Sequence, residues 1–207
     1  ILPTGYKDEM DLIMKAACEV FGGKDALIEK PRMIALINTV SPLSLDERML
    51  DCLMILAEYG QPAILCPATM LGATGSISMA GTLASGAAES LAGIVLAQMI
   101  RPGTPVLFGV QSTAADMKGG ITFACAAPEG TLMQGFAANM AKFYGLPSRG
   151  GGCQTDAPVI NCQAGYESML TFSSAYRHGI NFVMEAGGVM DSVNATSFEK
   201  MLVDFEI

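Results

Sequence analysis

The segment Arg101-Pro-Gly-Thr-Pro-Val106-Leu-Phe-Gly-Val110 decides how the chain is expected to fold. Gly103 can adopt the left-handed backbone that ends a helix, and Pro105 cannot continue one. The run from Val106 to Val110 is short and apolar, as a buried strand is. The segment therefore reads as the junction between a helix and a strand, and Tyr144-Gly-Leu-Pro-Ser-Arg149 repeats the same order.

Outward from this junction, short apolar runs alternate with longer amphipathic segments, and successive runs start 30 to 43 residues apart. Such a period is typical of strand–helix–strand units. The expected strands are Met33 to Asn38, Ala63 to Cys66, Val106 to Val110, Pro147 to Arg149 and Asn181 to Glu185. The expected helices are Asp8 to Phe21, Leu45 to Tyr59, Gly81 to Arg101, Glu129 to Tyr144 and Gln163 to Arg177.

The ends of the helix at Leu45 to Tyr59 are marked by local signals. Ser44 and Glu47 have the spacing of a capping box, and Gly60 supplies a left-handed stop. Repeated units of this kind require a parallel sheet covered by helices, which is either doubly wound or closed into a barrel. A complete (β/α)8 barrel needs about 200 to 250 residues. Only five units fit here, so either the sheet is open or three strands are missing.

The composition limits the possible partners. A net charge of -8 with twelve scattered Lys and Arg residues argues against nucleic acid. The segment Ser78 to Ile100 carries one charge, Glu89, but its small residues and flanking strands favour a buried helix over a membrane span. No basic region precedes an apolar run at the start, so we expect a cytoplasmic chain cut from a longer one.

The cysteine and histidine content gives little support for a metal site. Six cysteines include no C-x-x-C pair, and there is one histidine, His178. A zinc site is therefore not expected, and buried thiols in a reducing compartment account for the cysteines. His178 falls at the end of an expected helix, where it can bind carbonyl groups.

Parallel α/β proteins bind their ligands at the carboxyl ends of the strands, so the loops there carry the candidate site. Asp116, Asp156 and Glu185 fall in or just before these loops. A single loop carboxylate is more often a backbone cap, but three at one mouth would suit acid–base chemistry or cation binding. We predict these three as catalytic residues that share one pocket with Gln111, Ser112 and Arg149.

Two glycine-rich segments suggest a different ligand. Gly72 to Ser76 precedes a helix, and Arg149 to Gly152 ends a strand, so either could bind a phosphate through backbone N–H groups. Neither matches a phosphate-loop or dinucleotide fingerprint. Tight turns, helix packing and a flexible strand end account for the same glycines.

The chain also resembles a known family. The blocks that carry the resemblance are Gly5-Tyr6 with Glu9-Met-Asp11, Ser90-Leu-Ala-Gly-Ile-Val-Leu-Ala-Gln98, Arg101-Pro-Gly-Thr-Pro-Val106, Tyr144-Gly-Leu-Pro-Ser-Arg149 and Gln163-Ala-Gly-Tyr-Glu167. Over almost its whole length the chain is similar to the trimethylamine methyltransferase (MttB-type) family.

The resemblance implies an α/β fold of the TIM type: a partial (β/α) barrel of about five units, forming a single domain over 1–207 and the central part of a longer (β/α)8 methyltransferase. It also implies an enzyme of methylamine metabolism and methanogenesis that transfers a methyl group from a methylated amine to the Co(I) of a separate corrinoid protein. The chain lacks the D-x-H-x-x-G corrinoid-binding pattern, so cobalamin would be supplied by that partner protein.

Some family members carry pyrrolysine, whereas this sequence shows standard residues alone. The resemblance therefore favours the members that demethylate quaternary amines such as glycine betaine, carnitine or proline betaine. Such a substrate needs positioning between aromatic faces and carboxylates, with a polar group for its own carboxylate. The residues that we predict to bind substrate are Gln111, Ser112, Phe123, Arg149, Tyr166 and Phe182.

Two other interpretations stay open. The chain could be a non-catalytic fragment or module that binds a small cation, or a phosphate-binding barrel enzyme that uses the glycine-rich segments. We also expect an inactive homo-oligomer of the 207-residue chain, because an incomplete barrel leaves sheet edges and apolar inner faces to be covered.

Overall fold

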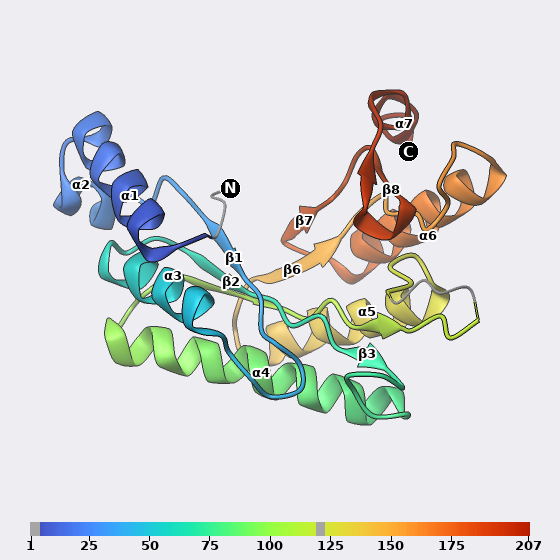
Figure 1. Ribbon diagram of the computed structural model, residues 1–207, viewed down its shortest axis with the longest axis horizontal. Helices are drawn as coiled ribbons and strands as arrows, with labels where there is room; N and C mark the ends of the chain where they lie inside the picture. The colour runs from blue at the N-terminus through green and yellow to red at the C-terminus, as the bar shows by residue number, and fades with distance from the viewer. Residues whose placement is uncertain (1–4, 119–122) are drawn as a thin grey trace.

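The computed structural model describes residues 5–118 and 123–207 (Figure 1). Its helices are α1 Lys7–Phe21, α2 Lys24–Glu29, α3 Glu47–Glu58, α4 Met79–Ile100, α5 Pro128–Phe143, α6 Cys162–His178 and α7 Phe198–Asp204, with a short 3-10 helix, η1, at Asp191–Val193. Its strands are β1 Ala35–Ile37, β2 Ala63–Leu65, β3 Met70–Leu71, β4 Val106–Gly109, β5 Thr113–Ala114, β6 Ser148–Gly151, β7 Phe182–Met184, β8 Val189–Met190 and β9 Ala195–Thr196. Every strand and helix expected from the periodicity is present.

The main sheet contains the five expected strands in the order β1-β2-β4-β6-β7, and every neighbouring pair is parallel. The predicted parallel sheet is therefore confirmed, and its strands follow one another in chain order. The sheet curls into a half-barrel with α3, α4 and α5 on one face (Figure 1). A parallel pair, β3 and β5, follows the carboxyl ends of β2 and β4, and β8 and β9 form an antiparallel hairpin. The expected partial barrel is confirmed as a curled, parallel five-stranded sheet. The described strands do not close into a complete barrel.

The core lies between the sheet and the first five helices. Alternate strand residues point to this outer face, because successive side chains of a strand lie on opposite sides of the sheet. They pack against Met10 and Met14 of α1, Leu53 of α3 and Met133 of α5. The strand residues of this core are Ala35, Ile37, Ala63, Leu65, Val106, Phe108 and Val110.

The remaining strand residues point to the concave inner face. Leu36, Ile64 and Leu107 are paired in register and form one apolar row across β1, β2 and β4. One step toward the carboxyl ends, Arg149 is paired with Gly109 on one side and with Phe182 on the other. The inner face thus changes from apolar to charged toward the ends of the strands, where a barrel carries its site.

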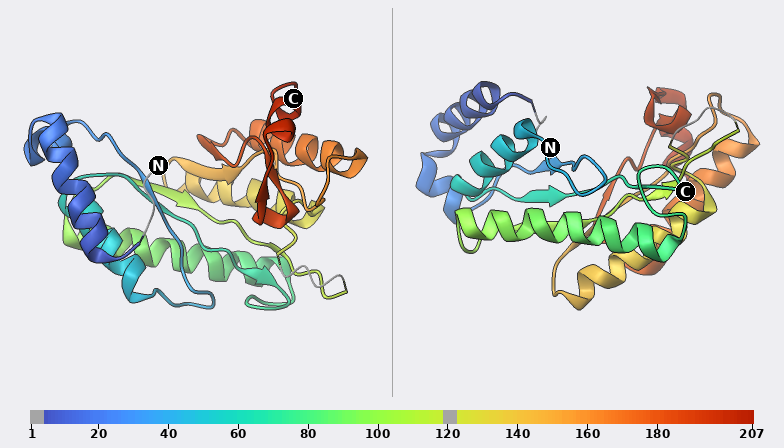
Figure 2. Two further views of the ribbon diagram at one scale, coloured as in Figure 1. Left: turned by 45° about the horizontal axis from the view of Figure 1, so that its top comes forward. Right: turned by 60° about the horizontal axis from the view of Figure 1, so that its bottom comes forward.

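Helix α4 runs along the sheet (Figure 2). It is the one helix in 5–118 and 123–207 that could cross a membrane by length and composition. It nevertheless packs on β2 and β4: Ser90 Oγ donates to the carbonyl oxygens of Leu65 at 3.0 Å and Gly109 at 3.1 Å. A Cβ at Gly93 would lie 2.4 Å from the Leu65 side chain. The small residues therefore serve close packing within the half-barrel, as expected.

The helix ends show one error in the sequence analysis. Asp46, not Ser44, caps α3: its Oδ1 accepts from Met49 N at 2.7 Å, while Ser44 Oγ donates to the Pro42 carbonyl. Ser44 instead forms a bridge with Val40, so the loop extends two residues further before the helix starts. Asp is at least as good an N-cap as Ser, and the true cap is the residue directly before the helix.

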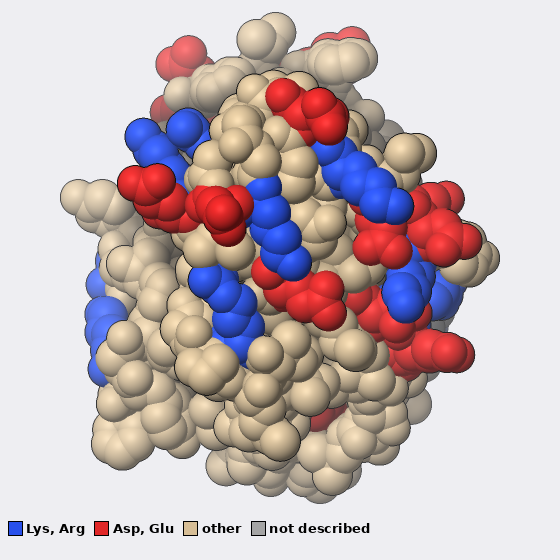
Figure 3. All heavy atoms as spheres, turned by 90° about the vertical axis from the view of Figure 1, so that its left-hand side faces the viewer, with Lys and Arg blue, Asp and Glu red and all other residues tan. Residues whose placement is uncertain are grey.

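Charged residues of both signs alternate over the face that carries the N-terminal helices (Figure 3). Lys24 lies over the ring of Tyr59 at 4.5 Å, and Arg32 lies over Phe21 at 5.4 Å. The cations on this side are thus interspersed with carboxylates and aromatic rings. This face has no continuous basic surface of the kind that binds a phosphate backbone.

Candidate active site

An arginine from the centre of the sheet lies at the middle of the candidate site. Arg149 of β6 is 1% exposed, and its Nη2 donates to both carboxylate oxygens of Glu185, at 2.7 and 2.6 Å. Its Nη1 donates to Gln111 Oε1 and to Cys66 Sγ, the latter at 3.3 Å. The residues that follow β2, β4 and β7 therefore meet at the guanidinium of one residue within β6.

Gly109 explains how Arg149 reaches across the sheet. Arg149 is on β6 and Cys66 follows β2, so the side chain must pass over β4, where Gly109 is its register partner. A Cβ at Gly109 would lie 3.0 Å from the Leu65 carbonyl oxygen and 3.2 Å from Cys66 Sγ. A side chain at this position would therefore crowd Cys66, which accepts from the guanidinium.

Glu185 reaches Arg149 through an unusual backbone conformation. Phe182 shares the inner face with Arg149, so alternation along β7 would place Met184 on the inner face and Glu185 on the outer face. Glu185 instead has a φ of 53°, in the left-handed region that non-glycine residues rarely adopt. This conformation turns the carboxylate back toward the barrel interior.

The ion pair of Arg149 and Glu185 is largely shielded from water. Burial raises the pKa of the Glu185 carboxyl, and the Arg149 guanidinium offsets only part of that rise. Burial likewise raises the pKa of the Cys66 thiol, so the contact of Arg149 with sulfur is a contact with a neutral group. The positive charge of the guanidinium is therefore neutralised by the Glu185 carboxylate and not by the thiol.

The sequence analysis identified Gln111, Arg149 and Glu185, which the structure brings together. It missed Cys66 and Gln154, whose Nε2 donates to Glu185 Oε2 at 3.3 Å. Cys66 follows directly after a strand, in the same position that singled out the others, but it was read as an inert buried thiol. Gln154 lies in the loop after β6 and carries no charge to mark it.

The Asp156 carboxylate lies outside the Arg149 cluster and is hydrogen-bonded to neighbouring loops. Its Oδ1 accepts from Cys125 N at 2.9 Å, Cys125 Sγ at 3.0 Å and Ser192 Oγ at 2.8 Å, and its Oδ2 accepts from Ala126 N at 3.1 Å. These bonds join the loops that follow β4, β6 and β7. The carboxylate thereby holds three loops together, and its predicted catalytic role stays a prediction.

The other predicted site residues lie at different depths. Ser112 is buried and its Oγ has no hydrogen-bond partner among the described residues. Asp116 accepts from Lys118 N at 2.9 Å in the loop after β5, and Phe123, at the far side of the undescribed 119–122, is half-buried.

Phe182 is half-buried beside Arg149 on the inner face, whereas the Tyr166 ring is 77% exposed on α6.

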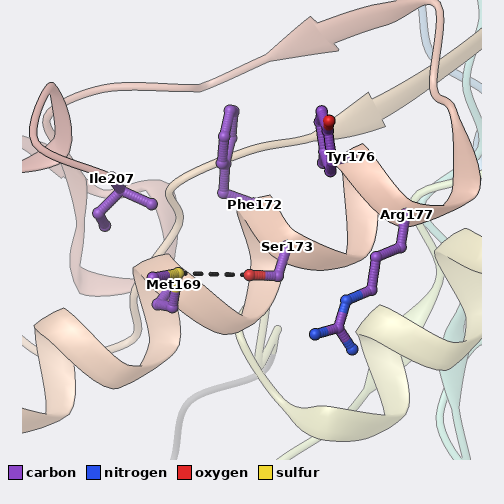
Figure 4. Close-up of a pocket in the computed structure, with 6 residues that line it drawn as sticks. All are labelled: Met169, Phe172, Ser173, Tyr176, Arg177 and Ile207. Carbon is purple, nitrogen blue, oxygen red and sulfur yellow. Dashed lines mark hydrogen bonds between the residues drawn. The ribbon is translucent and has the colours of Figure 1, made fainter.

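A hollow of about 430 Å³ lies beside α6 and is lined by none of the residues of this cluster (Figure 4). Its walls come from Met169, Phe172 and Tyr176 of α6 and from Ile207 at the end of the chain. The single histidine, His178, is also on α6, where its Nδ1 meets the Ser174 carbonyl oxygen at 2.8 Å. The histidine therefore acts at the helix end, as expected.

The glycine-rich turn at Gly72 to Ser76 uses its own N–H groups. Ala73 N and Gly75 N donate to the Met70 carbonyl oxygen, and Gly72 N donates to that of Ser76. Gly151 is likewise paired in the sheet. These amides are not free to cradle a phosphate, which removes the support for the phosphate-binding interpretation.

The donor groups at the mouth are a guanidinium, carboxylates, amides and a neutral thiol. No group of three or more His, Cys, Asp or Glu residues suited to a metal ion occurs within the described part of the chain. Chemically, the cluster can hold a carboxylate at Arg149 and an organic cation at Glu185.

Comparison with known proteins places these features in context. The family model described as trimethylamine methyltransferase (MTTB) matches residues 4–207. A glycine betaine methyltransferase of Desulfitobacterium hafniense (strain Y51) is 45% identical over 201 residues, which are 97% of this chain and 42% of that protein. A proline betaine:corrinoid methyltransferase of Eubacterium limosum is 35% identical over 85% of this chain and 36% of its own length.

Trimethylamine methyltransferase MttB of Methanosarcina barkeri (strain Fusaro / DSM 804) is 34% identical over 90% of this chain and 37% of its own length. The chain thus spans about two fifths of the length of these curated relatives.

Proposed function

The chain belongs to the trimethylamine methyltransferase family, and from this premise we propose that it is the central part of an amine:corrinoid methyltransferase. The reaction moves a methyl group from a methylated, quaternary amine to the Co(I) of a separate corrinoid protein in the cytoplasm. The observation that carries the proposal is the 45% identity to a glycine betaine methyltransferase over 97% of the chain. The identity to the trimethylamine enzyme is lower, at 34%.

The charged cluster supports a substrate with charges of its own. Arg149 is the second residue of β6, and its guanidinium meets Glu185 directly after β7, toward the end of the sheet where barrel enzymes carry their sites. A quaternary nitrogen already holds its positive charge, so the C–N bond breaks with its electron pair leaving on a neutral tertiary amine. No proton needs to be delivered, and positioning supplies most of the rate enhancement.

The residues of this chain then have binding and orienting roles. Glu185 and the half-buried ring of Phe182 offer a carboxylate and an aromatic face to the cation, and such aromatic contacts contribute about 0.5 to 2 kcal/mol each. Arg149 and Gln111 hold a substrate carboxylate. The corrinoid, when its carrier protein docks, supplies the nucleophile that accepts the methyl group.

The test uses the protein produced from its complete open reading frame together with its cognate corrinoid protein. Glycine betaine should yield dimethylglycine and a methylated corrinoid, followed by the absorbance change of the reduced cobalt, and trimethylamine should yield neither. Turnover of trimethylamine at an equal rate would reject the quaternary-amine assignment. Absence of transfer from every methylated amine would reject the methyltransferase itself.

For the 207-residue chain alone, we propose association with another copy. The outer strands of the described sheet, β1 and β7, each have one strand neighbour, and Leu36 and Leu107 on the inner face are half-buried. Burying apolar surface stabilises such contacts by about 25 cal/mol per Å². Sedimentation at micromolar concentration tests this, and a stable monomer that binds no hydrophobic dye would exclude it.

A further inference from the structure

The contact between Arg149 and Glu185 has the form of a bound ligand. One guanidinium nitrogen donates to both oxygens of a carboxylate, at 2.7 and 2.6 Å, at the carboxyl ends of the strands. We propose that Glu185 is an internal stand-in for the carboxylate of a zwitterionic quaternary-ammonium substrate. The substrate carboxylate replaces Glu185 on Arg149, and the released Glu185 carboxylate then pairs with the quaternary nitrogen. The inference rests on the proposed function for the reaction, but its binding step does not involve methyl transfer.

Arg149 is held in place independently of Glu185. Its Nη1 donates to Gln111 and to Cys66, and the residue is 1% exposed. Nη2 contacts Glu185 alone among the hydrogen bonds of the described residues. One side of the guanidinium fork is therefore anchored to the fold, and the other side is the one at which a carboxylate can be exchanged.

Several features of Glu185 favour its displacement from Arg149. Its φ of 53° costs free energy, which a return to extended backbone would release while turning the side chain away from Arg149. The next residues are Ala186 and Gly187, and Gly188 then anchors the segment: its N–H donates to Asp204 Oδ2 and its carbonyl accepts from Ser197 N, so the movement is confined to the residues before it. The carboxylate is 18% exposed, in contrast to 1% for Arg149. Solvent thus reaches the member of the pair that has to move.

Charge balance selects the substrate class. Leaving a buried charge without its partner is strongly unfavourable, so a ligand binds well only if it leaves neither member unpaired. A plain anion would occupy Arg149 and leave Glu185 without its partner, and a plain cation would draw Glu185 away from Arg149. A zwitterion brings one charge of each sign and leaves none unpaired. The geometry therefore favours a betaine over a simple methylated amine.

The exchange predicts effects of opposite sign for two half-ligands, acetate and tetramethylammonium. In Glu185→Gln, acetate no longer has to displace a charged competitor, so its dissociation constant should fall at least about tenfold, while that of tetramethylammonium rises. In Arg149→Gln, Glu185 is already free, so tetramethylammonium should bind at least about tenfold more tightly and acetate more weakly. Both variants should bind glycine betaine more weakly.

The measurement is a saturation-transfer NMR titration of each half-ligand and of glycine betaine with the protein from its complete reading frame. Glu199→Gln on exposed α7 makes the same charge change away from the site and should leave all three affinities unaltered. If Glu185→Gln does not fold, Glu185→Asp keeps the charge, shortens the reach to Arg149 and should still tighten acetate binding. Weaker or unchanged binding of both half-ligands in the variants would overturn the exchange.

The outcomes separate this inference from the function on which it rests. Methyl transfer from glycine betaine with no opposite-sign effect would leave the function standing and reject the exchange. The opposite-sign effects without any methyl transfer would support the exchange and reject the function.

Discussion

Two of the ion pairs formed by the described residues are buried, and they differ in how the fold surrounds them. Lys200 and Asp204 lie one turn apart on α7 and are each 1% exposed, with Nζ to Oδ2 at 2.6 Å. Lys200 also donates to Cys153 O and Ser168 Oγ, and Asp204 accepts from Gly188 N. The Lys200 ammonium thus donates three hydrogen bonds: one to Asp204, one to Cys153 and one to Ser168.

The pair at the mouth of the half-barrel is different. Arg149 and Glu185 are 36 residues apart on two strands, one member is partly exposed, and its backbone is strained. Burial alone therefore does not distinguish the pair that we propose to bind substrate from the pair that holds α7 in place. The Lys200 pair joins α7 to the loop after β6, whereas the Arg149 pair leaves one carboxylate within reach of solvent.

The largest effect is expected on breaking the Lys200–Asp204 ion pair. Asp204→Ala would leave the Lys200 ammonium buried without a counter-charge, which should lower the free energy of unfolding by about 3 to 5 kcal/mol. Urea unfolding followed by circular dichroism measures it. The double variant Asp204→Ala with Lys200→Met should recover much of the loss, because no charge is then left unpaired. An unchanged stability in Asp204→Ala would refute the structural role.

Arg149→Lys tests the functional member. Lysine keeps the positive charge but loses the planar fork that binds Gln111 and Glu185 together. The KM for glycine betaine should rise about 10- to 100-fold, a loss of about 1.4 to 2.8 kcal/mol, with a smaller change in kcat. Steady-state methyl transfer to the corrinoid protein provides both constants. Equal falls in kcat and kcat/KM would instead place Arg149 in the chemical step.

Gly109→Ala tests whether the path of Arg149 across β4 matters. The new Cβ would lie 3.0 Å from the Leu65 carbonyl oxygen and crowd Cys66, so the strands or the guanidinium must shift. We expect a stability loss of about 1 to 3 kcal/mol and weaker betaine binding. Gly165→Ala on α6, where a Cβ meets nothing within 4 Å, is the matched control. Full affinity in Gly109→Ala would show that Arg149 does not need this path.

The smallest expected effect is a pH dependence. Burial raises the folded-state pKa of Glu185, with Arg149 and Gln154 facing the carboxyl, so the folded protein keeps this proton to a higher pH than the unfolded chain does. The free energy of unfolding should therefore fall as pH rises through the interval above the ordinary glutamate value. Urea unfolding from mildly acidic to neutral pH should show a shallower fall in Glu185→Gln. A steeper fall in that variant would contradict the sign.

Much of the fold follows from local patterns. The junctions at Gly103 and Gly145 have φ values of 85° and 67°, so the helix stops read from glycine are real. The five parallel strands and their order follow from the repeat, because short connections bring consecutive strands side by side. The cap of α3 was misplaced because Ser44 and Asp46 offer the same kind of side chain two residues apart, and only the loop geometry chooses between them.

The sequence by itself determined the strand–helix period, the outer apolar core and the positions of Gln111 and Glu185 just after strands, since each depends on spacing along the chain; Arg149, expected at a strand end, lies two residues before the end of β6. The tertiary structure alone decided which of these groups meet. Asp156 is drawn to the N–H groups of Cys125 and Ala126. The pair of Arg149 with Glu185 joins residues 36 positions apart and depends on a backbone angle at Glu185 that reverses the alternation of β7, and no local sequence pattern predicts that angle.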